Sequence, residues 1–226
     1  MPPGAVGADP GVHRRARHRL SAGPVTVRHV LLDADGVVQH GVRDPFALLR
    51  RWAGDRAEEL GHALWAAERG PLRGQGDFLE SVRRLVPSYA DVDPDTLYES
   101  LWTDITPSEA TLALVDRLRG AGLGVHLGTN QHRQRGEHMR TVLGFDRLFD
   151  VSCYSWELGT KKPEPDYFEI ALERIGAPAD EVLFVDDMEA NVEAARTVGL
   201  RAEHWHLDRG HDVLEGLLAG HGLLLD

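Results

Sequence analysis

Short apolar runs alternate with amphipathic segments along most of this chain. Buried strands are predicted wherever a short run is mostly apolar, at 25–32, 124–127, 149–154, 181–185 and 200–204. Helices are predicted where apolar residues recur every three or four positions, at 107–120, 131–143, 166–175, 189–198 and 212–218. Strands that alternate with helices predict an α/β fold, a doubly wound parallel sheet covered by helices on both faces.

One stretch departs from this alternation. Its helical segments, separated by glycines and prolines and without a strand between them, are 45–52, 56–68, 77–85 and 95–102. We therefore expect a core domain of residues 25–40 and 104–226, with a small all-helical domain of residues 41–103 inserted into it. The core is expected to resume at a capping box from Thr106 to Glu109, with Pro107 as the first helical residue.

Composition narrows the classes of function. The net charge of −11 argues against nucleic-acid binding, which needs a basic face. No apolar run approaches the length of a membrane span. The single Cys153 excludes a disulfide framework and suits a reducing compartment, so a cytoplasmic protein is expected. Residues 1–24 are rich in Pro, Gly, Ala, Arg and His and are predicted to be a disordered extension. The sequence is compatible with a monomer or a homodimer.

Two pairs of carboxylates follow predicted strands directly, at the sheet edge where ligands bind in open α/β folds. Asp33 and Asp35 are two residues apart, so both side chains can face one cleft. One such carboxylate can attack phosphorus while the other protonates the leaving oxygen. Adjacent Asp186 and Asp187 repel each other unless a cation lies between them, and Mg²⁺ prefers such oxygen ligands. The alternative at both places is an acidic turn in solvent.

Other polar residues fall at the same predicted edge. Thr129 and Asn130 follow a strand and can either hold phosphate oxygens or cap the next helix. Lys162, which Pro163 keeps out of helical geometry, can neutralise a phosphate, and Lys161 competes for that role. Asn191 would lie one helical turn after the acidic pair and could orient one of its carboxylates.

These motifs, taken together and in this order, resemble the haloacid dehalogenase-like hydrolase superfamily, whose members are mostly phosphatases. The matching segments are 32–37 (LDADGV), 127–130 (LGTN), 159–166 (GTKKPEPD) and 184–187 (FVDD) with Asn191. The helical stretch resembles the cap of that superfamily. Its position is similar to that in sugar-phosphate phosphatases and in the phosphatase domain of soluble epoxide hydrolases. The resemblance implies a Rossmann-like core.

The resemblance also implies roles for the residues near the first strand. Asp33 would be the nucleophile and a metal ligand. Asp35 would be the general acid and base and would bind the metal through its backbone carbonyl. Thr129 and Asn130 would bind the phosphate, and Lys162 would stabilise charge on the phosphate and on Asp33.

The remaining roles complete a Mg²⁺ site. Asp187 would be a metal ligand, and Asp186 and Asn191 would lie next to it without binding the metal. Which of the two aspartates binds the metal directly stays open. The expected function is a Mg²⁺-dependent phosphatase that hydrolyses a small phosphorylated metabolite, such as a sugar phosphate, through an aspartyl-phosphate.

Three alternatives stay open at this point. A 2-haloacid dehalogenase uses an aspartate nucleophile without a metal, and Asp35 argues against it. A phosphosugar mutase would need a bisphosphate, and a non-catalytic binding protein would not need the intact acidic set. The sequence does not identify the substrate.

Overall fold

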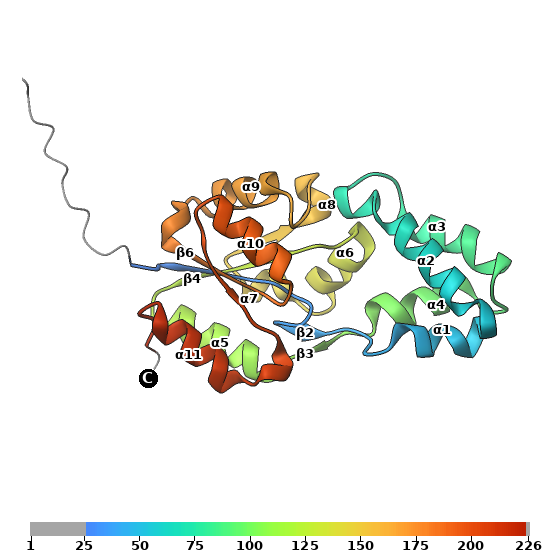
Figure 1. Ribbon diagram of the computed structural model, residues 1–226, viewed down its shortest axis with the longest axis horizontal. Helices are drawn as coiled ribbons and strands as arrows, with labels where there is room; N and C mark the ends of the chain where they lie inside the picture. The colour runs from blue at the N-terminus through green and yellow to red at the C-terminus, as the bar shows by residue number, and fades with distance from the viewer. Residues whose placement is uncertain (1–25, 225–226) are drawn as a thin grey trace, which may run out of the picture.

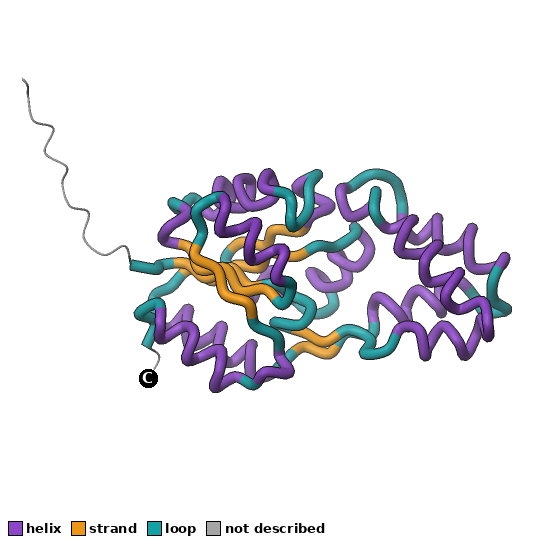
Figure 2. The backbone as a smooth tube through the Cα atoms, in the orientation of Figure 1, coloured by secondary structure: helices purple, strands orange, loops and turns teal. Residues whose placement is uncertain are grey.

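The computed structural model describes residues 26–224, and the predicted extension at 1–24 lies outside them. Five parallel strands form the central sheet in the order β5-β4-β1-β6-β7 (Figure 1, Figure 2). Their bounds are β1 His29–Leu32, β4 Gly124–Thr129, β5 Val151–Tyr154, β6 Val182–Asp186 and β7 Arg201–His204. Strand β1 lies between β4 and β6, with Leu32 in register with Leu127 and Val185. The residues that follow these three strands are therefore neighbours at one edge.

Helices cover both faces of this sheet, as the alternating pattern predicted. The core helices are α5 Glu109–Gly120, α6 Arg133–Thr141, α7 Phe145–Leu148, α8 Ser155–Leu158, α9 Pro165–Ile175, α10 Glu189–Thr197 and α11 His211–Gly220, with short 3-10 turns at Ala179–Glu181 and Leu207–Arg209. Successive strand residues point to opposite faces. Leu32 and Val185 thus pack with α5 and α11, whereas Leu31 and Phe184 pack with α9 and α10. The doubly wound α/β fold is confirmed (Figure 1).

Residues 41–103, called the insert below, are helical and have an apolar cluster of their own. The helices are α1 Pro45–Ala53, α2 Ala57–Glu68, α3 Phe78–Leu85, α4 Pro94–Tyr98 and the π-helix Glu99–Thr103, with 3-10 turns at Gly54–Arg56, Pro71–Arg73 and Val86–Ser88. Leu60, Phe78 and Val82 are fully buried in this cluster. The insert lies beyond the end of the sheet toward which the strands run, on the right of Figure 1. Its status as a separate domain stays a prediction.

The chain enters and leaves the insert through a second, two-stranded sheet that the sequence pattern did not predict. Strand β2, Gln39–His40, pairs antiparallel with β3, Thr106–Pro107. The capping box predicted from Thr106 is therefore wrong. Ser108 caps α5 instead, and its side chain accepts a hydrogen bond from the backbone N–H of Thr111 at 3.2 Å. A residue before proline prefers extended geometry, which places Thr106 in a strand rather than at a helix start.

Several predicted boundaries move by a few residues. Strand β1 begins at His29 rather than at residue 25, and the helix predicted at 95–102 begins at Pro94 as α4, capped by Asp93, and continues as the π-helix. The short helices α7 and α8 carry too few residues to show a periodic pattern. Between residues 26 and 224, no helix combines the length and the apolar character needed to cross a bilayer.

Candidate active site

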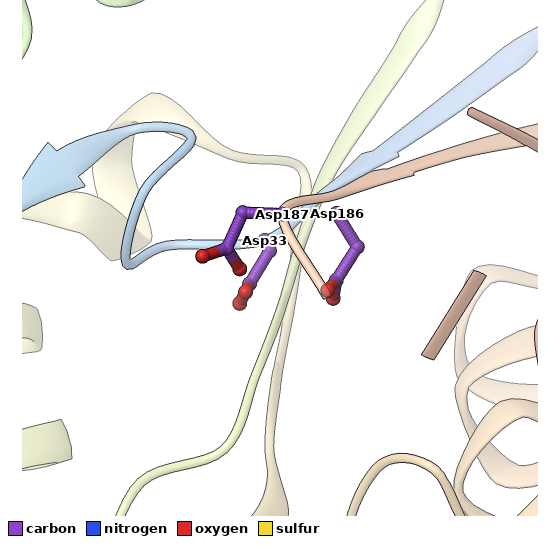
Figure 3. Close-up of side chains that lie close together, drawn as sticks. All are labelled: Asp33, Asp186 and Asp187. Atoms are coloured by element: carbon purple, nitrogen blue, oxygen red, sulfur yellow. The ribbon is translucent and has the colours of Figure 1, made fainter. Parts of the chain in front are cut away.

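Three aspartates meet at the carboxyl ends of β1 and β6. Asp33 follows β1, Asp186 ends β6, and Asp187 comes directly after it. One oxygen atom from each carboxylate lies within 4.8 Å of the others. Figure 3 shows the three side chains pointing to the same side of the strand ends. The parallel register of the two strands thus brings together acidic residues that are 153 positions apart along the chain (33 to 186).

Lys162 is the cation of this cluster. Its side chain is 1% exposed, and its Nζ lies 2.7 Å from Asp33 Oδ1 and 2.6 Å from Asp186 Oδ2. The same ammonium donates a hydrogen bond to the Gly128 carbonyl at 2.8 Å. Burial alone would lower the pKa of Lys162, but the two carboxylates outweigh it and raise that pKa above its ordinary value. Lys161 instead directs its Nζ to the carbonyl of its neighbour, so Lys162 is the one of the two lysines that contacts the aspartates.

Asn130 holds the loop that carries this lysine. Its side-chain Oδ1 accepts a hydrogen bond from the Lys162 backbone N–H, and its Nδ2 donates to the Lys162 carbonyl, both at 2.9 Å. Thr129, buried at the end of β4, accepts a hydrogen bond on its hydroxyl from Gln131 Nε2 at 2.9 Å. Both predicted residues therefore lie at the expected edge. The amide of Asn130 is engaged in positioning Lys162.

The two adjacent aspartates differ in what surrounds them. Asp186 is fully buried, and its Oδ1 accepts hydrogen bonds from the Met188 backbone N–H at 2.8 Å and from Asn191 Nδ2 at 2.9 Å. Its other oxygen atom binds Lys162. Asp187 is half-buried, and burial together with the Asp186 charge raises its pKa. Asp186 thus binds three protein donors, and Asp187 is the more accessible of the two carboxylates.

The acidic cluster fits a divalent cation. Burial raises the pKa of Asp33 well above its ordinary value, and the Asp186 charge adds to this, while Lys162 opposes it. Oxygen-only donors that include one or two free carboxylates are the set that Mg²⁺ uses. A bound cation reverses the local electrostatics by favouring the ionised form of each carboxyl group. Burial and the Asp186 charge thus both disfavour ionisation of Asp33 and Asp187, and a bound cation would oppose them.

Gly36 allows the chain to pass close to this cluster. Its φ of 75° lies in the left-handed region, which glycine adopts without steric cost. A Cβ atom at this position would lie 2.7 Å from Asp187 Oδ2 and 2.9 Å from His206 Cδ2. The left-handed backbone and the close approach are thus two separate reasons for glycine here.

Asp35 is not part of the three-aspartate cluster and binds an arginine that the sequence pattern did not single out. Arg135 of α6 donates from Nη1 to Asp35 Oδ2 at 2.5 Å and from Nη2 to Oδ1 at 2.8 Å. Gln39 and Gln131 add hydrogen bonds to the same carboxylate at 3.0 and 2.9 Å. Burial raises the pKa of Asp35, but the charge and hydrogen bonds of Arg135 outweigh it and hold that pKa well below its usual range.

Arg135 also connects the core to the insert. Its Nε donates to the carbonyl of Trp102, in the π-helix of the insert, at 2.6 Å. The available sequence signal was the i, i+4 spacing of Gln131 and Arg135 immediately after the Thr129 strand end. That spacing places two polar side chains on one side of a helix start. It did not indicate a carboxylate partner.

Comparison with known proteins decides the family. The model of the haloacid dehalogenase-like hydrolase family matches residues 27–199. The chain belongs to this family. This hydrolase is 28% identical over 207 residues to mouse (Mus musculus) acyl-CoA dehydrogenase family member 10, a match that covers 84% of this chain and 19% of the mouse protein. It is 32% identical over 100 residues to the sesquiterpene phosphatase astK of Aspergillus oryzae, covering 44% of this chain and 51% of the fungal protein.

Solved structures of the haloacid dehalogenase-like family share the fold. The family enzyme BT-2542 of Bacteroides thetaiotaomicron superimposes with a TM-score of 0.69 at 20% identity, covering 79% of this chain and 93% of that one. A structure of the same enzyme in complex with magnesium and inorganic phosphate superimposes with a TM-score of 0.64. At this identity the likeness concerns the fold alone.

Proposed function

We propose that this hydrolase is a Mg²⁺-dependent phosphatase that cleaves a small phosphorylated metabolite through an aspartyl-phosphate on Asp33. The observation that carries the proposal is the position of the Asp33 carboxylate, bound to Lys162 at 2.7 Å beside Asp187. The phosphatase activity named for the Aspergillus relative supports it, as does the magnesium and phosphate complex of BT-2542.

In the first step, an Asp33 carboxylate oxygen attacks phosphorus and the bond from phosphorus to the ester oxygen breaks. Lys162 neutralises negative charge on Asp33 and on the transferring group. Asp33, Asp187 and the backbone carbonyl of Asp35 would hold Mg²⁺. When bound, the ion reduces the repulsion between a carboxylate and a phosphate. Asn130 keeps Lys162 in place through two hydrogen bonds to the backbone.

Asp35 donates a proton in the first step and accepts one in the second. The leaving oxygen takes a proton from Asp35, and in the second step water attacks phosphorus, returns a proton to Asp35 and releases phosphate from Asp33. Arg135 holds Asp35 ionised, which suits the second step. A phosphate dianion that binds nearby adds negative charge and raises the pKa of Asp35, which favours proton uptake before the first step.

The first test uses p-nitrophenyl phosphate with added Mg²⁺. Asp33→Asn should abolish release of p-nitrophenol, because an amide is not a nucleophile for phosphorus. Asp166→Asn, which changes an exposed aspartate in the first turn of α9, is the matched control and should keep full activity. Full activity of Asp33→Asn would overturn the nucleophile assignment.

Metal dependence separates the alternatives. A chelator should abolish turnover, and added Mg²⁺ should restore it. Chelator-resistant release of halide from a 2-haloacid would favour a dehalogenase instead. Release of inorganic phosphate without an added bisphosphate distinguishes hydrolysis from a mutase reaction.

A further inference from the structure

A cavity of about 380 Å³ lies between the insert and the core, beside Asp35. Its size is in the range of small-molecule binding sites. Asp35, Asn130 and Arg135 line it on the core side. The insert supplies a wall that is mainly apolar, formed by Pro45, Leu49, Leu64, Trp65, Leu72 and Leu101. If Asp35 protonates the leaving oxygen, the group attached to that oxygen must occupy this cavity.

The polar side chains of the lining on the core side already have partners within the protein. Asn130 uses both ends of its amide on the Lys162 backbone. Arg135 donates from Nε to the Trp102 carbonyl and from both terminal nitrogen atoms to Asp35. Arg135 keeps one N–H on Nη2 and Asn130 one on Nδ2, so these two side chains offer a ligand few hydrogen-bond donors.

Glu68 is the acidic side chain that the insert contributes to the cavity. Its Oε1 accepts a hydrogen bond from Trp102 Nε1 at 3.0 Å and lies 2.8 Å from His132 Nδ1. Burial lowers the pKa of His132, although Glu68 opposes this, so the imidazole is not a ready cation for an anionic ligand. A carboxylate on the wall disfavours a leaving group that carries a second phosphate or a carboxylate of its own.

We propose that the substrate is a phosphate monoester of an apolar, uncharged alcohol, with an alkyl or aryl carbon skeleton in this cavity. The proposal rests on the proposed function, because it takes Asp35 as the residue at the leaving oxygen. A sugar would place most of its hydroxyl groups against leucine and tryptophan, where few hydrogen-bond partners are available, which is costly. The binding of an apolar skeleton is instead favoured, because apolar surface is removed from water. The cavity therefore selects against the sugar phosphates that the family resemblance implies.

The test is a series of primary alkyl phosphates from ethyl to octyl, compared with glucose 6-phosphate in the presence of Mg²⁺. The ratio kcat/KM should rise by about threefold to fourfold for each added methylene until the cavity is filled. Glucose 6-phosphate should be no better a substrate than ethyl phosphate. A flat kcat/KM along the series, or a preference for glucose 6-phosphate, would overturn the inference while leaving the phosphatase function intact. Hydrolysis that survives Asp33→Asn would instead refute the proposed function.

A pair of leucine variants tests whether the alkyl group of the substrate binds in this cavity. Leu101 and Leu79 are both partly buried in the apolar cluster of the insert, but only Leu101 lines the cavity. Leu101→Gln should lower the octyl-to-ethyl ratio of kcat/KM by about tenfold. Leu79→Gln should leave that ratio unchanged. An equal fall in both variants would show that the preference follows the integrity of the insert, and the assignment of the cavity would be wrong.

Discussion

Replacing Lys162 by methionine removes a buried charge while keeping most of the side-chain volume. In the wild-type protein the ammonium lies within 2.8 Å of three oxygen atoms, on Asp33, Asp186 and Gly128. The side chain is 1% exposed, so solvent does little to screen these contacts. Its loss leaves two neighbouring buried carboxylates without the cation that separates them.

The expected cost is large for a single substitution. Removing one partner of a buried ion pair typically destabilises a protein by about 3–5 kcal/mol, because the remaining charge stays buried and unpaired. A domain of this kind has a total free energy of unfolding of about 5–15 kcal/mol. Lys162→Met should therefore lower the urea midpoint markedly at neutral pH. The matched control is Lys161→Met, which removes a partly exposed lysine that contacts only a backbone carbonyl by hydrogen bond.

The pH dependence identifies the cause. The pKa of Asp33 is raised on folding, chiefly by burial, and the loss of Lys162 should raise it further. A carboxyl group whose pKa is raised on folding favours the folded state while it is protonated and disfavours it as the pH rises through the folded pKa. The difference between wild type and Lys162→Met should thus be small at a pH below the folded pKa of Asp33 and should grow as the pH rises through that pKa.

Urea titrations at several pH values, with and without Mg²⁺, measure these effects. Mg²⁺ should restore part of the stability of Lys162→Met, since a ligand that binds only the folded state stabilises it by mass action. A destabilisation below about 1 kcal/mol at neutral pH, far under the cost of unpairing a buried charge, would refute the reasoning. So would a destabilisation that is the same at every pH.

Two further predictions concern the turn and the arginine. Arg135→Met should move the acidic limb of the kcat–pH profile to higher pH by about one to three pH units, because Asp35 loses the cation that holds its pKa low. Arg135→Lys should move it less, and an unchanged limb would contradict this account. Gly36→Ala should weaken Mg²⁺ binding, measured by the Mg²⁺ dependence of activity, because its Cβ would lie against Asp187. Gly76 has a similar φ of 79° but open space where a Cβ atom would lie, so Gly76→Ala should lower stability without weakening Mg²⁺ binding. An equal loss of Mg²⁺ affinity in this variant would count against the steric contact at Gly36.

The parts of the site that the sequence predicted follow from one physical rule. A parallel strand that is covered on both faces must be an apolar run, so the first polar residue after it marks the sheet edge. Asp33, Thr129 and Asp186 each end or follow such a run. Their proximity then needs no information beyond the parallel sheet and its strand order.

The parts that were missed depend on contacts between distant segments. Strands β2 and β3 have two residues each, too few for a periodic pattern, and their pairing joins the two ends of the insert. An arginine on a helix is usually exposed to solvent, and nothing nearby in the sequence sets Arg135 apart. Its burial depends on Trp102 and Asp35, which lie 33 and 100 positions away. No local pattern records such a partner.

Local charge explains why two aspartates on one strand end behave in opposite ways. Asp35 has a guanidinium to itself, so the pair is neutral and its carboxyl group stays ionised. Asp33 shares one ammonium with Asp186 and lies beside Asp187. With all four groups ionised, that cluster keeps two negative charges, which is the charge that one divalent cation neutralises. The carboxylate proposed to move protons thus has its counter-charge built into the protein. The carboxylates proposed to hold the metal have only part of theirs, because Asp33 and Asp186 share Lys162.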